Sequence, residues 1–256
     1  MPSCDGCRNG TGLDFDLKIA FQPIFDCEAD VPFAYEALVR GPHGESARWV
    51  LDQIHDGNRY AFDQECRVAA IRTAVAAGLL DGPAKLSINF MPNAVYSPQA
   101  CIQLTLKTAS ETGLPTDRLI FEFTENEQVD TAHARDIIDA YAALGFATAV
   151  DDFGAGYSGL GLLANLKTDI IKLDMELIRG IDVSEPRRQI VRATVSLLRE
   201  MGRVVVAEGI ETASELEVLR DLGVRYVQGF HIAKPMLGAF PPVDLGRDRL
   251  GRAAAA

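Results

Sequence analysis

The sequence predicts an α/β fold, a TIM-like (β/α)8 barrel with the first strand antiparallel. Short apolar runs that end in a polar side chain recur along the chain, and segments with helical spacing of apolar residues separate most of them. The chain has 256 residues, and a length of about 250 residues suits one such barrel. Because β/α barrels carry their chemistry at the carboxyl ends of the strands, the polar ends predict an active site there. The seven runs are 33–36, 86–89, 119–122, 148–152, 170–172, 204–208 and 226–228.

The reversed first strand follows from a short connection. Strands are expected at Lys18–Phe25 and Val31–Val39, and only Asp26 to Asp30 lie between them. Parallel neighbours need a crossover of roughly a dozen residues or more. The first two strands therefore form an antiparallel hairpin.

The other elements follow from periodicity and from helix start and stop signals such as Pro98, Gly113 and Gly145. No linker, repeat or low-complexity block divides the chain, which predicts one domain: a flexible extension over 1–17, the barrel over 18–245 and a tail over 246–256. Six further strands, expected at 85–89, 118–123, 146–150, 170–173, 203–207 and 225–227, bring the total to eight. Helices are expected at 47–55, 62–77, 98–110, 129–144, 160–166, 186–201 and 212–222.

Composition limits the location and the partners. No apolar run approaches the ~20 residues of a membrane span, and the first residues lack a signal-peptide core, so a cytoplasmic protein without membrane contact is expected. The net charge is −11 and no basic run occurs, which argues against binding duplex nucleic acid. An anionic ligand then requires metal ions or a few placed cations to offset the acids.

The five cysteines do not indicate a disulfide framework, because their number is odd and no secretion signal is present. Cys4 and Cys7 form a CxxC pair, but no second pair follows at zinc-ligand spacing. A mobile segment is favoured there over a metal site. The other cysteines are expected to pack as small hydrophobic residues.

Four oxygen donors come from four different predicted strands: Glu36, Asn89, Glu122 and Asp151. Hard oxygen ligands suit Mg²⁺ or Mn²⁺. The chain has four histidines and none ends a predicted strand, which excludes a histidine-rich site.

Asp152 follows Asp151 directly, so the two carboxylates could serve two metal ions of the kind that drive phosphodiester cleavage. An isolated Asp-Asp pair more often begins a turn or caps a helix. The other acids at strand ends favour the two-metal interpretation here.

Other polar residues near strand ends are candidates for catalysis. Lys172 lies in an apolar strand, where burial is costly without carboxylate partners; it could orient the attacking water or bind phosphate, or it could snorkel to solvent. Glu208 is a candidate second-metal ligand or base. Glu211 repeats the same strand-end pattern, or it could begin a helix, where acids are favoured. Glu125 lies at a loop junction, where it could brace a loop or be a solvated charge.

Three side chains are candidates for substrate contact. Gln22 and Gln228 could hydrogen-bond the edge of a base. Arg40 suits a phosphate oxygen through its bidentate guanidinium.

Eight ordered motifs make the chain resemble the EAL family of cyclic di-GMP phosphodiesterases. They span about residues 18 to 237, and a single Glu-Ala-Leu would carry no weight. The motifs are Gln22-Pro-Ile, Glu36-Ala-Leu-Val-Arg40, Ser87-Ile-Asn89, Glu122-Phe-Thr-Glu125, Asp151-Asp-Phe-Gly-Ala-Gly-Tyr-Ser158, Ile171-Lys-Leu-Asp174, Ala207-Glu-Gly-Ile-Glu211 and Gln228-Gly-Phe230.

The resemblance implies hydrolysis of cyclic di-GMP to linear pGpG with two ions, Mg²⁺ or Mn²⁺, in each active site. One ion would be held by Glu36, Asn89, Glu122 and Asp151, and the second by Asp151, Asp152 and Glu208. Lys172 would position the water with help from Glu208 and Glu211. Glu125 would anchor the loop 152–158, which couples metal binding to contacts in a homodimer. Gln22, Leu38, Arg40 and Gln228 would line the substrate.

The chain departs from the family pattern at few positions, and none removes a ligand. Ala155 replaces a common threonine, Phe230 a common tyrosine, and Phe90-Met91 follow the asparagine. Two alternatives to an active enzyme remain: a catalytically silent cyclic di-GMP receptor, and an adaptor that binds proteins. Silent members usually lose ligand acids, so the retained acids favour the enzyme.

Overall fold

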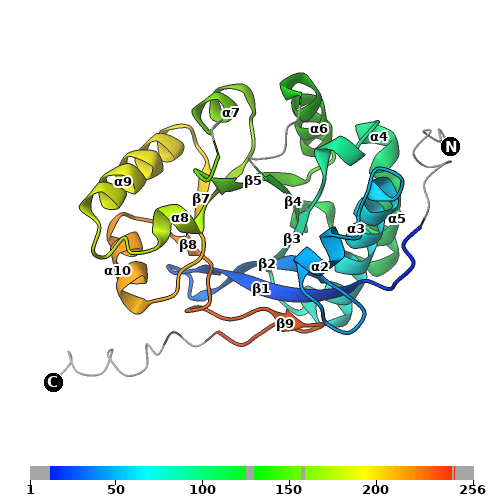
Figure 1. Cartoon of the computed structure of the whole chain (residues 1–256), viewed down its shortest axis with the longest axis horizontal. Helices are drawn as coiled ribbons and strands as arrows, with labels where there is room; N and C mark the ends of the chain where they lie inside the picture. The colour runs from blue at the N-terminus through cyan, green and yellow to red at the C-terminus, as the bar shows by residue number, and fades with distance from the viewer. Residues whose placement is uncertain (1–11, 125–129, 157–158, 244, 246–256) are drawn as a thin grey trace.

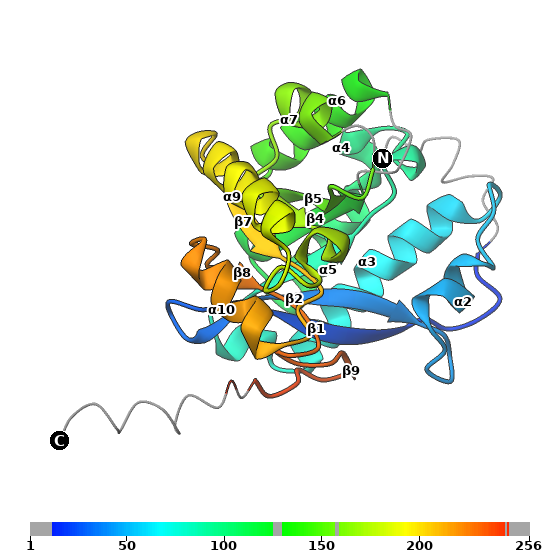
Figure 2. The same cartoon turned by 60° about the vertical axis from the view of Figure 1, so that its left-hand side comes forward.

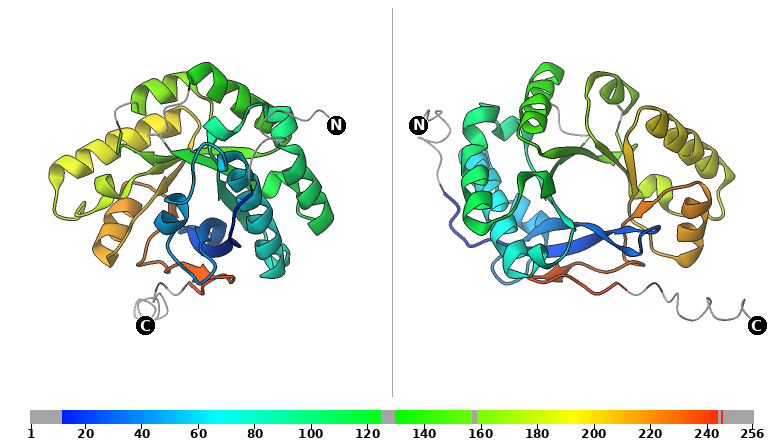
Figure 3. Two further views of the ribbon diagram at one scale, coloured as in Figure 1. Left: turned by 45° about the vertical axis from the view of Figure 1, so that its right-hand side comes forward. Right: turned by 180° about the vertical axis from the view of Figure 1, so that it is seen from behind.

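The predicted eight-stranded barrel is present. The computed structural model describes residues 12–124, 130–156, 159–243 and 245. The sheet order β2-β3-β4-β5-β6-β7-β8-β1 closes because β1 also pairs with β2, and the helices lie outside this ring (Figures 1 and 3). The strands are β1 Lys18–Asp26, β2 Val31–Arg40, β3 Lys85–Asn89, β4 Leu119–Thr124, β5 Ala147–Phe153, β6 Ile170–Leu173, β7 Val204–Ala207 and β8 Tyr226–Val227.

The hairpin prediction is confirmed. β1 runs antiparallel to β2 from the pair Lys18 and Arg40 to the pair Asp26 and Val31, and it is also antiparallel to β8. The strands from β2 to β8 are parallel to their neighbours. A ninth strand, β9 Met236–Leu237, pairs with β1 and was not predicted, because two residues are too few to show a period.

The helices match the predicted segments with three differences. The segment 47–55 is helical only as α2 Ala47–Leu51, because the Asn58 side chain accepts the His55 N–H at 2.8 Å and turns the chain. The segment 98–110 divides into two helices, and a short helix, α8 Met175–Ile178, was not predicted. Figure 2 shows α9 and α10 beside the strands that they cover. The helices are α3 Arg59–Ala76, α4 Pro98–Cys101, α5 Gln103–Thr112, α6 Thr131–Ala143, α7 Gly159–Asn165, α9 Glu185–Glu200 and α10 Ala213–Asp221, with 3-10 turns at Leu79–Asp81, Pro92–Ala94 and Thr116–Arg118.

The barrel interior has an apolar layer below a polar one. A cluster of buried residues fills the lower layer: Ile24, Ala34, Ile120, Ala149, Ile170 and Val206. Side chains two residues apart on a strand share a face, so the residue two positions nearer the mouth of the barrel also points inward. Those residues are Gln22, Glu36, Glu122, Asp151, Lys172 and Glu208. The two-residue alternation along each strand therefore places both the apolar core and the candidate site inside the barrel.

The segment before β1 packs on the barrel. Leu13, Phe15 and Leu17 are partly buried against a cluster that includes Val50 and Phe62. The domain boundary at residue 18 stays a prediction. In the part of the chain that the structure describes, no helix has the length and apolar character to cross a membrane.

Candidate functional site

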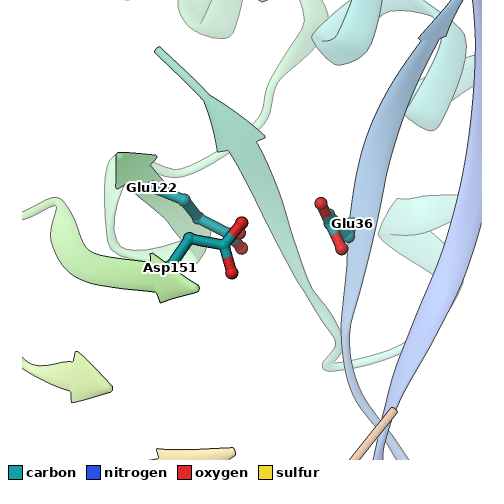
Figure 4. A group of neighbouring side chains, drawn as sticks. All are labelled: Glu36, Glu122 and Asp151. Atoms are coloured by element: carbon teal, nitrogen blue, oxygen red, sulfur yellow. The ribbon is translucent and has the colours of Figure 1, made fainter. Parts of the chain in front are cut away.

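Carboxylates from three strands point toward one another at the mouth of the barrel (Figure 4). Glu36 of β2, Glu122 of β4 and Asp151 of β5 each offer an oxygen, and these oxygens lie within 4.8 Å of one another. A second such group contains Asp151, Asp152 and Glu208, so Asp151 belongs to both. Each group could hold a metal ion, and the shared carboxylate would lie between the two.

Lys172 lies among these carboxylates. Its Nζ is 2.6 Å from Glu122 Oε2, 2.7 Å from Glu208 Oε1 and 3.0 Å from Asp151 Oδ1. Glu36 Oε2 is 3.5 Å away. The side chain is 1% exposed, so the snorkelling alternative is wrong.

The site holds more negative charge than one lysine can balance, and burial with mutual repulsion therefore favours the protonated acids. Burial, with the charges of Glu36 and Asp151, raises the pKa of Glu122 to about 8 although Lys172 lowers it. Burial and the neighbouring Asp151 raise the pKa of Asp152 to about 6. Burial also raises the pKa of Glu208 well above its usual value.

Lys172 stays charged in this setting. Burial alone would lower its pKa, but the surrounding carboxylates raise it well above the ordinary value. The remaining negative charge must be met by protons or by added cations. Because the donors are carboxylate oxygens, they fit hard divalent ions, and the excess charge supplies the attraction.

These shifts predict that protons compete with metal at this site. We expect the apparent Mn²⁺ affinity to rise between pH 6 and pH 8, where Asp152 and Glu122 lose their protons, and metal addition to release protons. The metal-free protein should be less stable at pH 8 than at pH 5. Its folded state retains protons that an unfolded glutamate with a pKa of 4.5 has lost, so stability falls as the pH rises through this range.

Proton release on Mn²⁺ addition, measured with a pH indicator in weak buffer, and urea unfolding at both pH values check this prediction. An Mn²⁺ affinity independent of pH would contradict it. So would equal stability of the metal-free protein at the two pH values.

Amide side chains complete the polar layer. The Asn89 amide donates to Glu36 Oε1 at 3.0 Å, and the Gln228 amide donates to Glu36 Oε2 at 2.6 Å. Gln228 also donates to Gln22 Oε1 at 3.3 Å. Gln228 Oε1 is buried and has no hydrogen-bond partner among the described residues. An unpaired buried acceptor is costly, which favours a ligand donor at this position.

A bulge explains how two consecutive aspartates reach one cavity. The pairing of β5 with β6 shifts register between Val150 and Phe153, and Asp152 has a left-handed φ of 54°. Strict alternation would turn one of the two carboxylates away from the barrel. Bulges re-aim side chains near functional sites, and both Asp151 and Asp152 line the same cavity.

Gly209 lets the chain turn closely after Glu208. Its φ is +67°, and a Cβ there would lie 2.2 Å from Met175 Cβ. A side chain at position 209 would therefore push the β7–α10 loop away from α8 and displace Glu208.

The cavity above the cluster has a volume of about 290 Å³. Most of its polar lining comes from predicted residues, but two charged lining residues, Asp174 and Arg179, were not predicted. Asp174 is two positions beyond Lys172 and follows the same alternation, which could have identified it. Arg179 directly follows the unpredicted helix α8. The lining is Gln22, Glu36, Asp151, Asp152, Asp174, Met175, Arg179, Glu208, Gly209, Glu211, Gln228, Gly229 and Phe230.

Two buried details of the site were also missed or differ from expectation. Ser87 donates to Glu122 Oε1, and it shares a strand face with Asn89, two positions away. Glu36 lies within β2 rather than at its end, opposite Gln22 and Ser87, because β2 extends to Arg40 beyond its pairing with β3.

Four other predicted residues lie apart from the carboxylate cluster or outside the described residues. Glu211 is exposed and pairs with Arg179. Leu38 lines a neighbouring apolar cavity that Glu36 and Asn89 also border. Arg40 donates to the Val39 carbonyl at 2.7 Å. Glu125 lies outside the residues that the structure describes.

Comparison with known proteins gives a consistent match. The EAL domain model matches residues 13–235. A solved structure described as a standalone versatile EAL protein from Vibrio cholerae O395, in a c-di-GMP bound form, is 45% identical, with a TM-score of 0.88 over 93% of this chain and 99% of that one. Klebsiella pneumoniae BlrP1, in a manganese and cy-diGMP complex, is 33% identical, with a TM-score of 0.84 over 91% of this chain and 60% of that one.

Curated relatives are more distant and mostly longer. The blue light- and temperature-regulated antirepressor BluF of Escherichia coli K12 is 30% identical over 88% of this chain and 55% of that protein. The probable cyclic di-GMP phosphodiesterase PdeN of the same organism is 27% identical over 85% of this chain and 43% of that protein. The chain spans 55% of BluF and 32% of an uncharacterized Azorhizobium caulinodans protein that it also matches.

Proposed function

The chain belongs to the EAL domain family, and from this premise we propose that it is a metal-dependent phosphodiesterase that hydrolyses cyclic di-GMP to linear pGpG. The observation that carries the proposal is the convergence of four carboxylates around Lys172 at the mouth of the barrel. Such a site attracts divalent cations, and cations are what an anionic phosphodiester needs in order to approach so many acids. Two bound ions, Mg²⁺ or Mn²⁺, would supply an activated water and neutralise charge on the phosphate.

Each oxygen donor has a part in this proposal. Glu36, Asn89, Glu122 and Asp151 would hold one ion, and Asp151, Asp152 and Glu208 would hold the other. The hydrogen bond from the Asn89 nitrogen to Glu36 leaves its amide oxygen as the atom able to ligate a cation.

Lys172 would position the attacking water and stabilise the negative charge that develops on the phosphate. A buried, preorganised cation is effective in this role because it needs no reorganisation during the reaction. Glu208 contacts Lys172 at 2.7 Å and would assist the proton transfer. Glu211, paired with Arg179, would have the lesser part.

Substrate contacts are proposed at Gln22, Leu38, Arg40 and Gln228. The buried, unpaired Oε1 of Gln228 supports a base donor at that position. The homodimer and the anchoring role of Glu125 remain proposals that rest on the family resemblance.

Chromatography of purified protein incubated with cyclic di-GMP and Mg²⁺ tests the proposal. We expect conversion to pGpG, loss of turnover with a chelator, and loss of turnover in Glu36→Ala. Glu217→Gln is a matched control, because Glu217 lines a different cavity at the other end of the barrel. Binding of cyclic di-GMP without any pGpG under saturating Mg²⁺ would reject the enzyme.

One comparison favours a second candidate, a regulatory binding protein, because the relative BluF is described as an antirepressor. Calorimetry separates the alternatives. A silent receptor binds cyclic di-GMP and produces no pGpG, whereas a protein-binding adaptor binds no nucleotide.

A further inference from the structure

We infer that the buried ion pair Asp63–Arg67 of α3 is a positioning device that holds Asn89 and Glu122 in place for metal binding. The inference rests on the metal site of the proposed function. The pair belongs to a helix outside the barrel wall, and neither residue lines the cavity above the cluster. Asp63 borders the neighbouring apolar cavity that Glu36, Leu38 and Asn89 also line.

The pair is unusually buried for two charged groups. The side chains of Asp63 and Arg67 are 1% and 0% exposed, and Arg67 Nη2 is 2.7 Å from Asp63 Oδ2. Removing two charges from water is costly, and apolar residues of similar volume are often as stable or more so. Because the pair adds little stability, we infer that it serves to hold the groups around it in a specific arrangement.

Asp63 holds the chain just after Asn89. Its Oδ1 accepts the N–H of Met91 at 3.0 Å, two residues beyond the candidate ligand. Phe90, between them, donates its N–H to the Glu122 carbonyl at 2.9 Å. The backbone that carries Asn89 is thus held by α3 on one side and by β4 on the other.

Arg67 holds the outer faces of the same two strands. Its guanidinium carbon lies 5.2 Å from the ring centre of Phe121 and 5.5 Å from that of Phe90, and its Nη1 donates to the Tyr141 hydroxyl at 2.8 Å. Phe90 follows Asn89 and Phe121 precedes Glu122 in the chain. Because neighbouring residues on a strand face opposite ways, aromatic rings fixed outside on Arg67 set the direction of the two oxygen donors inside.

Loss of groups that orient metal ligands typically weakens metal affinity by about 10- to 100-fold. We therefore expect Asp63→Leu/Arg67→Met to bind Mn²⁺ about 10- to 100-fold more weakly than the wild type, read from free Mn²⁺ by electron paramagnetic resonance. The apolar pair removes both charges together, so no buried charge is left unpaired.

A second Asp–Arg pair, at the opposite end of the barrel and with its arginine 40% exposed, controls for the loss of an ion pair away from the site. Asp26 pairs with Arg225 at 2.6 Å between Asp26 Oδ2 and Arg225 Nη2. Asp26→Leu/Arg225→Met should leave the Mn²⁺ affinity within about threefold of wild type, below the range expected for ligand-orienting groups. Urea unfolding of both variants shows the cost in stability of each pair.

Two further variants keep the test decisive if Asp63→Leu/Arg67→Met does not fold. Asp63→Asn/Arg67→Met retains an oxygen that can accept the Met91 N–H, and it should recover part of the affinity. Tyr141→Phe removes only the hydroxyl that Arg67 donates to, and it should weaken Mn²⁺ binding several-fold.

The inference is overturned if the folded Asp63/Arg67 variants bind Mn²⁺ as tightly as the wild type, or if the Asp26/Arg225 variant loses as much affinity. If only Tyr141→Phe can be measured, an Mn²⁺ affinity equal to that of the wild type in this variant also overturns the inference. A wild-type protein that binds no Mn²⁺ would overturn the proposed metal site and this inference with it. If the wild type binds Mn²⁺ and the Asp63/Arg67 variants bind it equally tightly, only the positioning role fails and the metal site stands.

Discussion

Replacing Lys172 with methionine is expected to lower the free energy of unfolding of the metal-free protein by about 3 kcal/mol or more, the cost of leaving buried charges without their partner. Lys172 is the cation that Glu36, Glu122, Asp151 and Glu208 share. Without it these carboxylates repel one another, and their protonation limits the loss only in part. Added Mn²⁺ should stabilise Lys172→Met more than it stabilises the wild type.

Urea unfolding with and without MnCl₂ measures both effects. Lys107→Met is the control, because the Lys107 side chain is 69% exposed and its Nζ lies 3.7 Å from Glu111 Oε1. Exposed ion pairs of this kind contribute about 0–1 kcal/mol to stability. The chromatographic assay with cyclic di-GMP should also show loss of turnover in Lys172→Met. An unchanged free energy of unfolding would mean that Lys172 is not the counterion of the cluster.

Asp151→Asn is expected to lower the hydrolysis rate by about 10³-fold or more, equivalent to ~4 kcal/mol of transition-state stabilisation. Asp151 is the carboxylate that belongs to both candidate metal groups, so its loss affects both ions. The replacement is isosteric and removes one negative charge from a site with an excess of them. Turnover should therefore fall while the metal-free protein becomes no less stable, or gains stability.

The charge of Asp151 is one cause of the raised pKa values of Glu122, Asp152 and Glu208. These values should move toward normal in Asp151→Asn, and the stability difference between pH 5 and pH 8 should shrink. Asp136→Asn, on the exposed side of α6, is the matched control. Turnover within tenfold of the wild type in Asp151→Asn would contradict the shared role.

Local patterns carried most of the fold. The five-residue connection after β1 predicted the hairpin, and the period of two in the strands placed an apolar layer and a polar layer inside the barrel. The elements that were missed are short. β9 has two residues and α8 has four, which is too few for periodicity. β9 is held by its pairing with β1, which is distant in sequence. α8 is capped by the Asp174 side chain, which accepts the Glu176 N–H.

The sequence predicted which residues form the candidate site better than it predicted how those residues are arranged. Residue type and position along each strand identified Glu36, Glu122, Asp151 and Lys172, and the structure brings them together. Arg179 was missed because it is recognisable only by the partner that it meets, Glu211. Ser87, which donates to Glu122, was also missed, although strand alternation places it on the same face as Asn89. Glu211 points to that partner instead of the cluster.

The sequence by itself determined which side chains face into the barrel, because alternation along a strand is a local property of the backbone and its apolar pattern. Only the tertiary structure decided how far each one reaches and what it meets there. The bulge that turns Asp152 into the cavity with Asp151 depends on the pairing of β5 with β6. The charge of Lys172 depends on carboxylates that lie on, or directly after, four other strands. Electrostatic interactions act across space rather than along the chain, so strand pairing has to bring these groups together before any pKa or metal affinity is set.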